Sequence, residues 1–277
     1  MNTIDIRALR KVQLYIVEDV KRVCNKYGIG YFLSCGSMLG AVRHKGYIPW
    51  DDDIDIGMSM TDYRRFLEIA PDELDRKLFI DNYDSNPDCA LVFTKVRMKN
   101  TRLVEAKGNK TAAHNEIFVD IFPYYHVSDN RIVRKAEAGL MSVMSQALFS
   151  KAGYKVWAGE GFAKRIKFLP VEMVGAILSK RYMHKVVDGL INKYNDTCNL
   201  SAHCGSSFER IYFPKEIFQD YIDAEFEGEL FKIPKKFDEY LTNAYGDYME
   251  LPPEEKRITH MIEELTIGDD IYESLNS

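Results

Sequence analysis

The sequence has no uninterrupted apolar run of the roughly 18 residues that a membrane-spanning helix needs. It also lacks a strong charge imbalance, because 37 Lys and Arg stand against 42 Asp and Glu, for a formal net charge of −5. The overall charge therefore gives no argument for nucleic-acid binding. The first residues do not form a basic stretch followed by an apolar one, so we expect no secretory signal and a cytoplasmic protein.

Cysteine is also scarce, with five residues at positions 24, 35, 89, 198 and 204. An odd number of scattered cysteines in a cytoplasmic protein is typical of reduced thiols. Cys198, His203 and Cys204 could be read as part of a zinc site. Their irregular spacing, and the lack of a second cysteine pair to complete the site, favour ordinary thiols.

The most informative feature of the sequence is a run of carboxylates. Asp51, Asp52, Asp53 and Asp55 lie within five residues. Two unit charges 4 Å apart repel by about 4 kcal/mol at an effective dielectric near 20. A fold gains nothing from such crowding unless a cation lies among the oxygens. Hard oxygen ligands suit Mg²⁺ or Mn²⁺ together with phosphate, so the run predicts a metal-dependent phosphoryl-transfer site.

Strand alternation separates these carboxylates. In residues 53–56, Asp53 and Asp55 should project from one face while Ile54 and Ile56 enter the core. Asp51 and Asp52 precede the strand and are expected to support the site. An EF-hand calcium loop is excluded because Ile56 and Asp62 occupy the positions that require Gly and Glu.

A Gly-Ser pair precedes the acidic strand. Gly36 allows close backbone approach to a phosphate, Ser37 offers a hydroxyl, and the helix expected to follow offers free N–H groups. Arg43 and Lys95 could neutralise phosphate oxygens, although a solvated face is the alternative for Lys95. No Gly-x-x-x-x-Gly-Lys-Ser/Thr loop occurs, which disfavours kinase chemistry.

Asp120 is a single carboxylate inside the apolar stretch 117–123. Burying it without a partner would cost several kcal/mol. A metal shared with Asp53 and Asp55 would relieve this cost, and so would a buried Arg or Lys. We predict that Asp120 is the third metal ligand and keep the ion pair as the alternative.

The hydrophobic pattern predicts a mixed succession of elements over the 277 residues, 46% of which are hydrophobic. We expect a helix over 3–28, a strand over 29–35 and a short helix from 38. Thr61 should cap a helix over 62–70, and a second short helix should begin at 71. Later strands are expected at 79–81, 90–98 with 101–105 as its hairpin partner, and 117–123, with a final helix over 237–244.

Residues 131–193 read as helical and are rich in Lys and Arg with few acids. A basic, partly apolar helical segment could lie on an anionic membrane surface, and a solvated lid is the alternative. Arg257 and His260 are spaced to share one side of a helical turn, either at the active site or on the surface.

Several stretches together resemble the LicD family, the broad group that includes fukutin and fukutin-related protein. The resemblance covers nearly the whole chain, is weakest over 131–205, and rests on these motifs: Gly36-Ser37, Leu39-Gly40-Ala41, Arg43-His44, the stretch 48–55, Asp120-Ile121-Phe122-Pro123, Glu227-Gly228, Pro234, Tyr245-Gly246-Asp247 and Pro252-Pro253.

The resemblance implies an α/β (α+β) fold: a nucleotidyltransferase-like mixed sheet flanked by helices, with a helical insertion and a C-terminal α/β return. We expect a catalytic core over 1–130, a basic helical segment over 131–205 and a C-terminal part over 206–277 that packs on the core, all in one continuous globular unit.

The resemblance also implies a reaction, the transfer of a phospho-alcohol, most often phosphocholine, from a CDP-activated donor to a glycan hydroxyl with release of CMP. Asp53, Asp55 and Asp120 would bind Mg²⁺ or Mn²⁺ and catalyse, while Gly36, Ser37, Arg43, Lys95 and Asp52 would bind the donor. The acceptor would be a glycan or lipid-linked glycan of lipopolysaccharide, teichoic acid or capsule, reached by peripheral contact with the inner membrane face. No nucleic acid is expected.

Two other functions stay open. A nucleotidyltransferase would move NMP from an NTP with the same carboxylates and release pyrophosphate, and a non-catalytic glycan-binding relative would have lost a metal carboxylate. A quaternary ammonium on the donor would need an aromatic cage. The candidates for this cage are Tyr47, Trp50, Tyr124, Tyr125 and Trp157.

Overall fold

The computed structural model describes residues 5–105, 114–154, 162–194, 198–203, 212–257 and 262–275. The α-helices in these ranges are α1 (Ile6–Tyr27), α2 (Cys35–His44), α3 (Met60–Glu73), α4 (Arg131–Lys151), α5 (Phe162–Ile177), α6 (Lys180–Ile191), α7 (Phe237–Tyr245) and α8 (Asp269–Ser274). The strands are β1 (Phe32–Leu33), β2 (Asp55–Ser59), β3 (Leu78–Asp81), β4 (Thr94–Met98), β5 (Thr101–Glu105), β6 (Phe118–Val127), β7 (Leu200–His203), β8 (Phe213–Pro214), β9 (Tyr221–Phe226), β10 (Glu229–Pro234) and β11 (Ile262–Ile267). Short 3-10 turns occupy Lys215–Phe218 and Glu254–Lys256.

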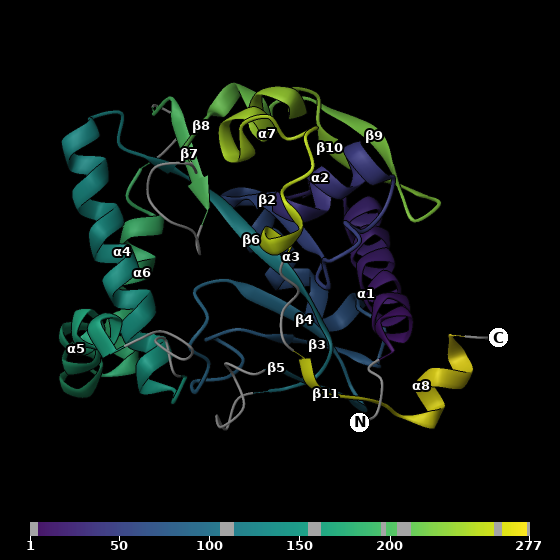
Figure 1. Ribbon diagram of the computed structural model, residues 1–277, viewed down its shortest axis with the longest axis horizontal. Coiled ribbons are helices and arrows are strands. Elements are labelled where there is room, and N and C mark those ends of the chain that lie inside the picture. Colours follow the sequence, from purple (N-terminus) through teal and green to yellow (C-terminus); the bar gives the residue numbers. More distant parts are fainter. Residues whose placement is uncertain are drawn as a thin grey trace.

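A mixed seven-stranded sheet forms the centre of the molecule (Figure 1). Its order is β1-β2-β6-β4-β3, with β7 pairing both β6 and β8. The long strand β6 runs parallel to β2 and antiparallel to β4 and β7. Two small sheets, β9–β10 and β5–β11, accompany it. This mixed α/β architecture confirms the predicted nucleotidyltransferase-like fold class.

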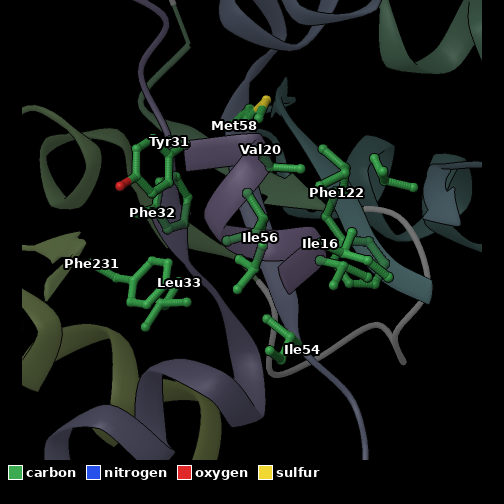
Figure 2. Close-up of a cluster of buried hydrophobic side chains, with 14 of the residues drawn as sticks. Ile16, Val20, Tyr31, Phe32, Leu33, Ile54, Ile56, Met58, Phe122 and Phe231 are labelled. Carbon is green, nitrogen blue, oxygen red and sulfur yellow. The ribbon is translucent and has the colours of Figure 1, made fainter. Parts of the chain in front are cut away.

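Helix α1 covers one face of the sheet because its apolar residues recur with helical spacing. Ile16 and Val20 on α1 pack beside Ile54, Ile56 and Met58, and all five side chains are fully buried (Figure 2). Asp5 begins the helix by accepting hydrogen bonds from the N–H groups of the first turn, and Gly28, with φ of 61°, ends it. The predicted helix over 3–28 is therefore confirmed to within a few residues.

Helices α4, α5 and α6 stand together at one side of the sheet (Figure 1). Their buried Met and Val side chains form a second apolar cluster that includes Tyr125 and Val127 from the second half of β6. The helical character predicted for 131–193 is confirmed for α4, α5 and α6. The predicted division of the chain at 130 and 205 stays a prediction. No helix within the described ranges is both long and apolar enough to cross a membrane.

Two predictions about α3 are wrong. The cap is Ser59, whose hydroxyl accepts from Asp62 N at 3.1 Å, and not Thr61. No second helix begins at Pro71, because α3 continues to Glu73 and Leu74 N donates to Ala70 O at 2.9 Å. A proline here removes only one helical hydrogen bond close to the end of the helix.

The predicted hairpin between 90–98 and 101–105 is also wrong. Both edges of β4 are already paired, with β3 and with β6, so no edge remains for β5. The chain turns at Asn100, with φ of 57°, and β5 pairs with the C-terminal strand β11. In addition, the strand predicted over 29–35 is shorter than expected, because Cys35 already begins α2.

Gly57 gives a stability test of the sheet. A Cβ at Gly57 would lie 2.4 Å from the ring of Phe32 and 2.8 Å from the ring of Tyr124. We expect Gly57→Ala to lower the free energy of unfolding by roughly 1–3 kcal/mol through overpacking. The measurement is urea denaturation followed by circular dichroism.

The matched control is Gly139→Ala. Gly139 is exposed on α4 and has nothing within 4 Å of an added Cβ. The better helix propensity of Ala should raise the free energy of unfolding by up to about 1 kcal/mol. Equal effects of the two substitutions would show that the ring packing over Gly57 is not restrictive.

Candidate functional site

Four charged residues form a row across neighbouring strands of the central sheet. Asp55 on β2 is the register partner of Asp120 on β6, Asp120 pairs with Lys95 on β4, and Lys95 pairs with Asp81 on β3. Directly paired residues project from the same face of a sheet. The structure therefore places Asp55, Asp120 and Lys95 beside one another on the same face of the sheet.

The acidic loop before β2 is fixed by helix α1. Arg10 Nη2 donates to Asp51 O at 2.7 Å, and Gln13 Nε2 donates to Asp52 O at 2.7 Å. Asp52 is buried, while Asp53 is half-buried just before β2. Ile54 and Ile56 are fully buried, which confirms that these two side chains enter the core.

Gly36 lets this loop approach the start of α2. A Cβ at Gly36 would lie 2.7 Å from Asp51 Oδ2. Glycine is therefore needed at position 36 because the Asp51 side chain approaches the backbone closely. The sequence had suggested that a phosphate would make this approach. The predicted phosphate contact stays a prediction.

The electrostatics of Asp55 show how tightly the carboxylates are gathered. Burial raises the pKa of Asp55 well above its usual value, and the charges of Asp53, Asp120 and Asp51 raise it further. Cys35 acts in the same direction. A cation among these oxygens would stabilise the ionised form of Asp55 and reverse this shift.

Asp120 has a cationic neighbour. Lys95 Nζ lies 2.7 Å from Asp120 Oδ1, and both residues are buried. The ammonium group also lies 3.0 Å from the centre of the Phe118 ring. The ion pair that the sequence had left as an alternative for Asp120 is thus present, and metal binding by Asp120 stays a prediction.

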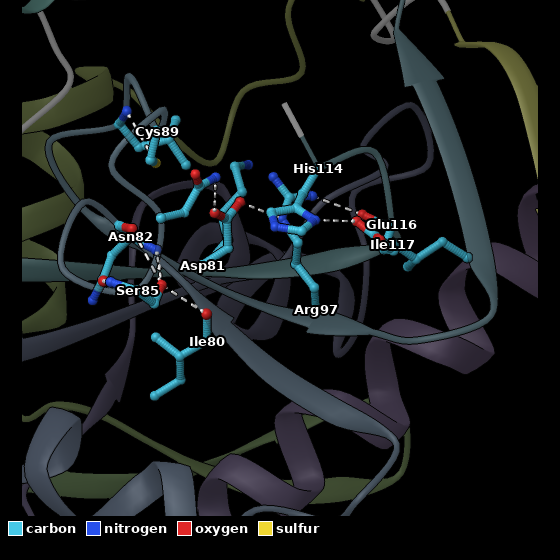
Figure 3. Close-up of polar contacts among 12 residues, drawn as sticks. Ile80, Asp81, Asn82, Ser85, Cys89, Arg97, His114, Glu116 and Ile117 are labelled. Carbon is cyan, nitrogen blue, oxygen red and sulfur yellow. Dashed lines mark hydrogen bonds and ion pairs between the residues drawn. The ribbon is translucent and has the colours of Figure 1, made fainter. Parts of the chain in front are cut away.

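Arg97 lies on the same face of β4 as Lys95 but forms an ion pair with Asp81. Arg97 Nε lies 2.6 Å from Asp81 Oδ2, and Arg97 Nη1 donates to Glu116 O at 2.8 Å (Figure 3). Asn86 Nδ2 donates to the other oxygen of Asp81 at 3.3 Å. This buried ion pair fixes the far end of the charged row.

Both backbone polar groups of Asp55 are tied to the start of α2. Asp55 N donates to Ser37 Oγ at 2.9 Å, and Ser34 N donates to Asp55 O at 2.9 Å. The Ser37 side chain is almost fully buried and therefore positions Asp55. The predicted contact of the Ser37 hydroxyl with phosphate stays a prediction.

A buried polar network that the sequence did not suggest lies beside this junction. Tyr124 OH is hydrogen-bonded to Ser34 Oγ at 2.6 Å and to Tyr240 OH at 2.8 Å, and Cys35 N donates to Tyr240 OH at 3.3 Å. Burial raises the pKa of the Cys35 thiol, which lies 3.8 Å from His203 Nε2. These residues come from distant elements, so no local sequence signal joins them.

Arg43 is bonded to the C-terminal segment. Its Nη1 donates to Tyr248 O at 2.6 Å and its Nε donates to His44 Nε2 at 2.9 Å. Arg43 lines a cavity of about 410 Å³ with Trp50, Tyr245 and other residues of the C-terminal segment.

This cavity combines aromatic and acidic side chains. Trp50, Tyr245 and Tyr248 line it together with Asp247 and Glu250. Trp50 directly precedes Asp51, and Leu39 and Arg43, which also line the cavity, belong to α2. The cavity therefore adjoins the acidic site.

The other predicted aromatic candidates lie elsewhere. Tyr47 is buried and bonded to Gln13, Tyr124 belongs to the polar network, and Tyr125 belongs to the second apolar cluster. Trp157 lies outside the described residues. Of the predicted candidates, the structure places Trp50 in this cavity.

Across the part of the chain that the structure describes, no three His, Cys, Asp or Glu side chains converge as ligands of one ion. Cys198 is a free thiol, and His203 lies against Cys35 and the Tyr124 ring. Cys204 and His260 lie outside the described residues, whereas Arg257 lies 5.0 Å from the centre of the Trp50 ring.

Comparison with known proteins gives consistent matches. The model of the LicD/FKTN/FKRP nucleotidyltransferase domain matches residues 28–138. The lipopolysaccharide cholinephosphotransferase LicD of Haemophilus influenzae is 32% identical over 281 residues, which cover 96% of this chain and 100% of that protein. The human ribitol 5-phosphate transferase FKRP is 44% identical over 57 residues, 21% of this chain and 11% of its own. The human ribitol-5-phosphate transferase FKTN is 32% identical over 69 residues, 25% of this chain and 15% of its own.

The crowding at Asp55 predicts a pH dependence of stability. Because the folded-state pKa of Asp55 is raised above the unfolded value of about 4, the folded protein holds this proton more tightly. The contribution to stability is complete below the unfolded pKa and is lost as the pH rises through the folded pKa. Asp55→Asn should therefore raise the free energy of unfolding at neutral pH, by roughly 1–3 kcal/mol, and flatten the pH profile.

Urea denaturation in EDTA over a pH series measures this effect. Asp72→Asn, on the exposed side of α3, is the control and should keep the wild-type slope. If Asp55→Asn and Asp72→Asn gave the same profile, the crowding at Asp55 would have no energetic consequence.

Proposed function

Because this chain belongs to the LicD family and is a phosphotransferase of the LicD type, we propose that it transfers phosphocholine from CDP-choline to a hydroxyl of a cell-surface glycan precursor. The sugar hydroxyl oxygen attacks the phosphorus that bears choline. The bond from this phosphorus to the oxygen of CMP breaks, and CMP leaves with the bonding electrons. The observation that carries the proposal is the row in which Asp55, Asp120 and Lys95 meet beside Asp53.

The carboxylates suit a divalent metal in their chemistry. Asp53 and Asp55 offer hard oxygen donors, and the raised pKa of Asp55 shows the charge crowding that Mg²⁺ or Mn²⁺ would relieve. In the arrangement described, convergence on one ion would require rotation of these side chains. When bound, the metal would neutralise charge on the donor diphosphate.

The remaining roles fall to residues around the row. Asp120 accepts the proton of the attacking hydroxyl, and Lys95, 2.7 Å from Asp120 Oδ1, holds that carboxylate in place. Gly36 and Ser37 present the first N–H groups of α2 to the donor phosphates. Asp52, whose carbonyl oxygen accepts a hydrogen bond from Gln13, helps to fix the acidic loop. Arg43 contacts the donor from the adjoining cavity.

The adjoining cavity favours choline over ribitol as the transferred alcohol. The rings of Trp50, Tyr245 and Tyr248 provide an aromatic surface that attracts a quaternary ammonium, although the Arg257 guanidinium also lies 5.0 Å from the centre of the Trp50 ring. Asp247 and Glu250 add negative charge. The Haemophilus influenzae cholinephosphotransferase matches this chain over its full length, whereas the human ribitol-phosphate transferases match over short segments.

The proposal includes a cytoplasmic location, a glycan or lipid-linked glycan as acceptor, peripheral contact with the membrane face and no nucleic acid as substrate. The nucleotidyltransferase alternative would use the same carboxylates but release pyrophosphate. A non-catalytic relative would have lost one of the carboxylates proposed to bind metal, and Asp53, Asp55 and Asp120 are all present.

Product analysis tests the reaction. With CDP-choline, Mg²⁺ and glycan acceptor, we expect CMP release that stops in EDTA and returns with Mg²⁺. Asp53→Asn and Asp55→Asn should each lower kcat/KM by roughly a thousandfold, because each weakens the charge stabilisation that a metal supplies. Asp72→Asn should retain activity. Pyrophosphate release from CTP without CMP release from CDP-choline would favour the nucleotidyltransferase.

Donor competition tests the cavity. Trp50→Leu and Tyr248→Leu should raise KM for CDP-choline by roughly tenfold each, because each removes an aromatic face from the ammonium. The KM for CDP-glycerol, whose alcohol is uncharged, should change little. Tyr272→Leu, at an exposed residue on α8, is the matched control. An equal rise for both donors would place the choline group elsewhere.

A further inference from the structure

Helix α5 is apolar on two sides, although it lies at the outer edge of the molecule (Figure 1). From residue 168 to residue 178, Glu172 is the sole charged residue in the sequence. A surface helix of a protein that stays in water normally carries charged residues on the side away from the core.

The inner side of α5 packs against the rest of the molecule. Val171, Val174 and Leu178 pack against the second apolar cluster. Gly175 permits close contact with α4, because a Cβ there would lie 2.8 Å from Ala147 O. Lys151 Nζ donates to Gly175 O at 2.8 Å and ties the two helices together.

The outer side carries a second apolar stripe. Leu169, Met173 and Ile177 follow one another at intervals of four residues and therefore share one side of the helix. They are exposed to 52%, 57% and 78%, and Tyr182 at the start of α6 is exposed to 54%. We call Leu169, Met173 and Ile177 the α5 outer face. An exposed cluster of this kind marks a surface that another apolar phase or partner covers.

The charge of the surrounding segment indicates which partner this is. Residues 131–193 contain twelve Lys and Arg but four Asp and Glu, whereas the whole chain has a net charge of −5. Arg181 and Lys185 are exposed one turn apart on α6, beside Tyr182. Apolar side chains combined with basic ones match a membrane surface that contains anionic lipid.

We propose that the α5 outer face binds an anionic membrane surface. Leu169, Met173 and Ile177 enter the boundary between headgroups and acyl chains, and Arg181 and Lys185 contact lipid phosphates. At about 1.5 Å per residue, the 16 residues of α5 are too short to span a bilayer, so the helix lies in the plane of the surface. This inference deepens the proposed function by giving the site at which the chain reaches a lipid-linked acceptor.

Vesicle co-sedimentation tests the inference. The full chain should bind vesicles of phosphatidylcholine mixed with phosphatidylglycerol and bind pure phosphatidylcholine vesicles far less. Met173→Ser combined with Ile177→Ser should lower the partition coefficient by about tenfold or more, because two apolar side chains no longer enter the bilayer. Arg181→Gln combined with Lys185→Gln should weaken binding by about tenfold and reduce its salt dependence.

Leu230→Ser is the matched control, since Leu230 is 56% exposed on β10, outside the α5 outer face. CMP release from a soluble acceptor should be unchanged in every variant, so loss of vesicle binding is distinguishable from failure of the proposed reaction. Unchanged vesicle binding in Met173→Ser/Ile177→Ser would overturn the inference. The inference would also be overturned if the protein formed a dimer in the absence of vesicles and the same substitutions dissociated it, because the α5 outer face would then bind a second copy of the chain.

Discussion

The parallel pairing of β2 with β6 is the constraint on which the site depends. It places Asp55 directly beside Asp120, although 64 residues separate them in the chain. Parallel neighbours require a crossover connection, and here α3, β3, β4 and β5 lie between the two strands. Within this connection, β4 pairs with the edge of β6 opposite to β2, and this pairing places Lys95 beside Asp120. One strand arrangement thus brings the two aspartates and the lysine together.

Such a gathering of charge is costly, and the surroundings show how the fold accommodates it. Lys95 compensates Asp120, and Arg97 compensates Asp81, each in a buried ion pair. Asp55 instead has acidic neighbours, and burial together with the charges of Asp53, Asp120 and Asp51 raises its pKa. Its position is fixed instead through the backbone, by Ser34 and Ser37. The fold therefore holds Asp55 in place through its backbone, while its surroundings disfavour the ionised carboxylate.

Much of this could be read from the sequence because the relevant signals are local. The alternation of Asp53, Ile54, Asp55 and Ile56 predicted the burial of Ile54 and Ile56, and helical periodicity predicted α1. The pairing of β5 with β11 could not be predicted, because it follows from the occupation of both edges of β4. The network of Tyr124, Tyr240 and Ser34 was also missed, since it joins hydroxyl groups from three separate elements. The C-terminal residues of the Trp50 cavity were missed for the same reason, as they approach that loop only in the folded chain.

The ten residues of β6 have a mechanical consequence. Its first half carries Asp120, and its second half carries Tyr125 and Val127, which pack with helices α4 and α6. An extended strand is stiff along its axis, because its backbone is already close to full length. A displacement of the helical cluster along this axis would therefore move Asp120 by nearly the same amount. The charged row and the helices beside the α5 outer face therefore lie at the two ends of one continuous strand.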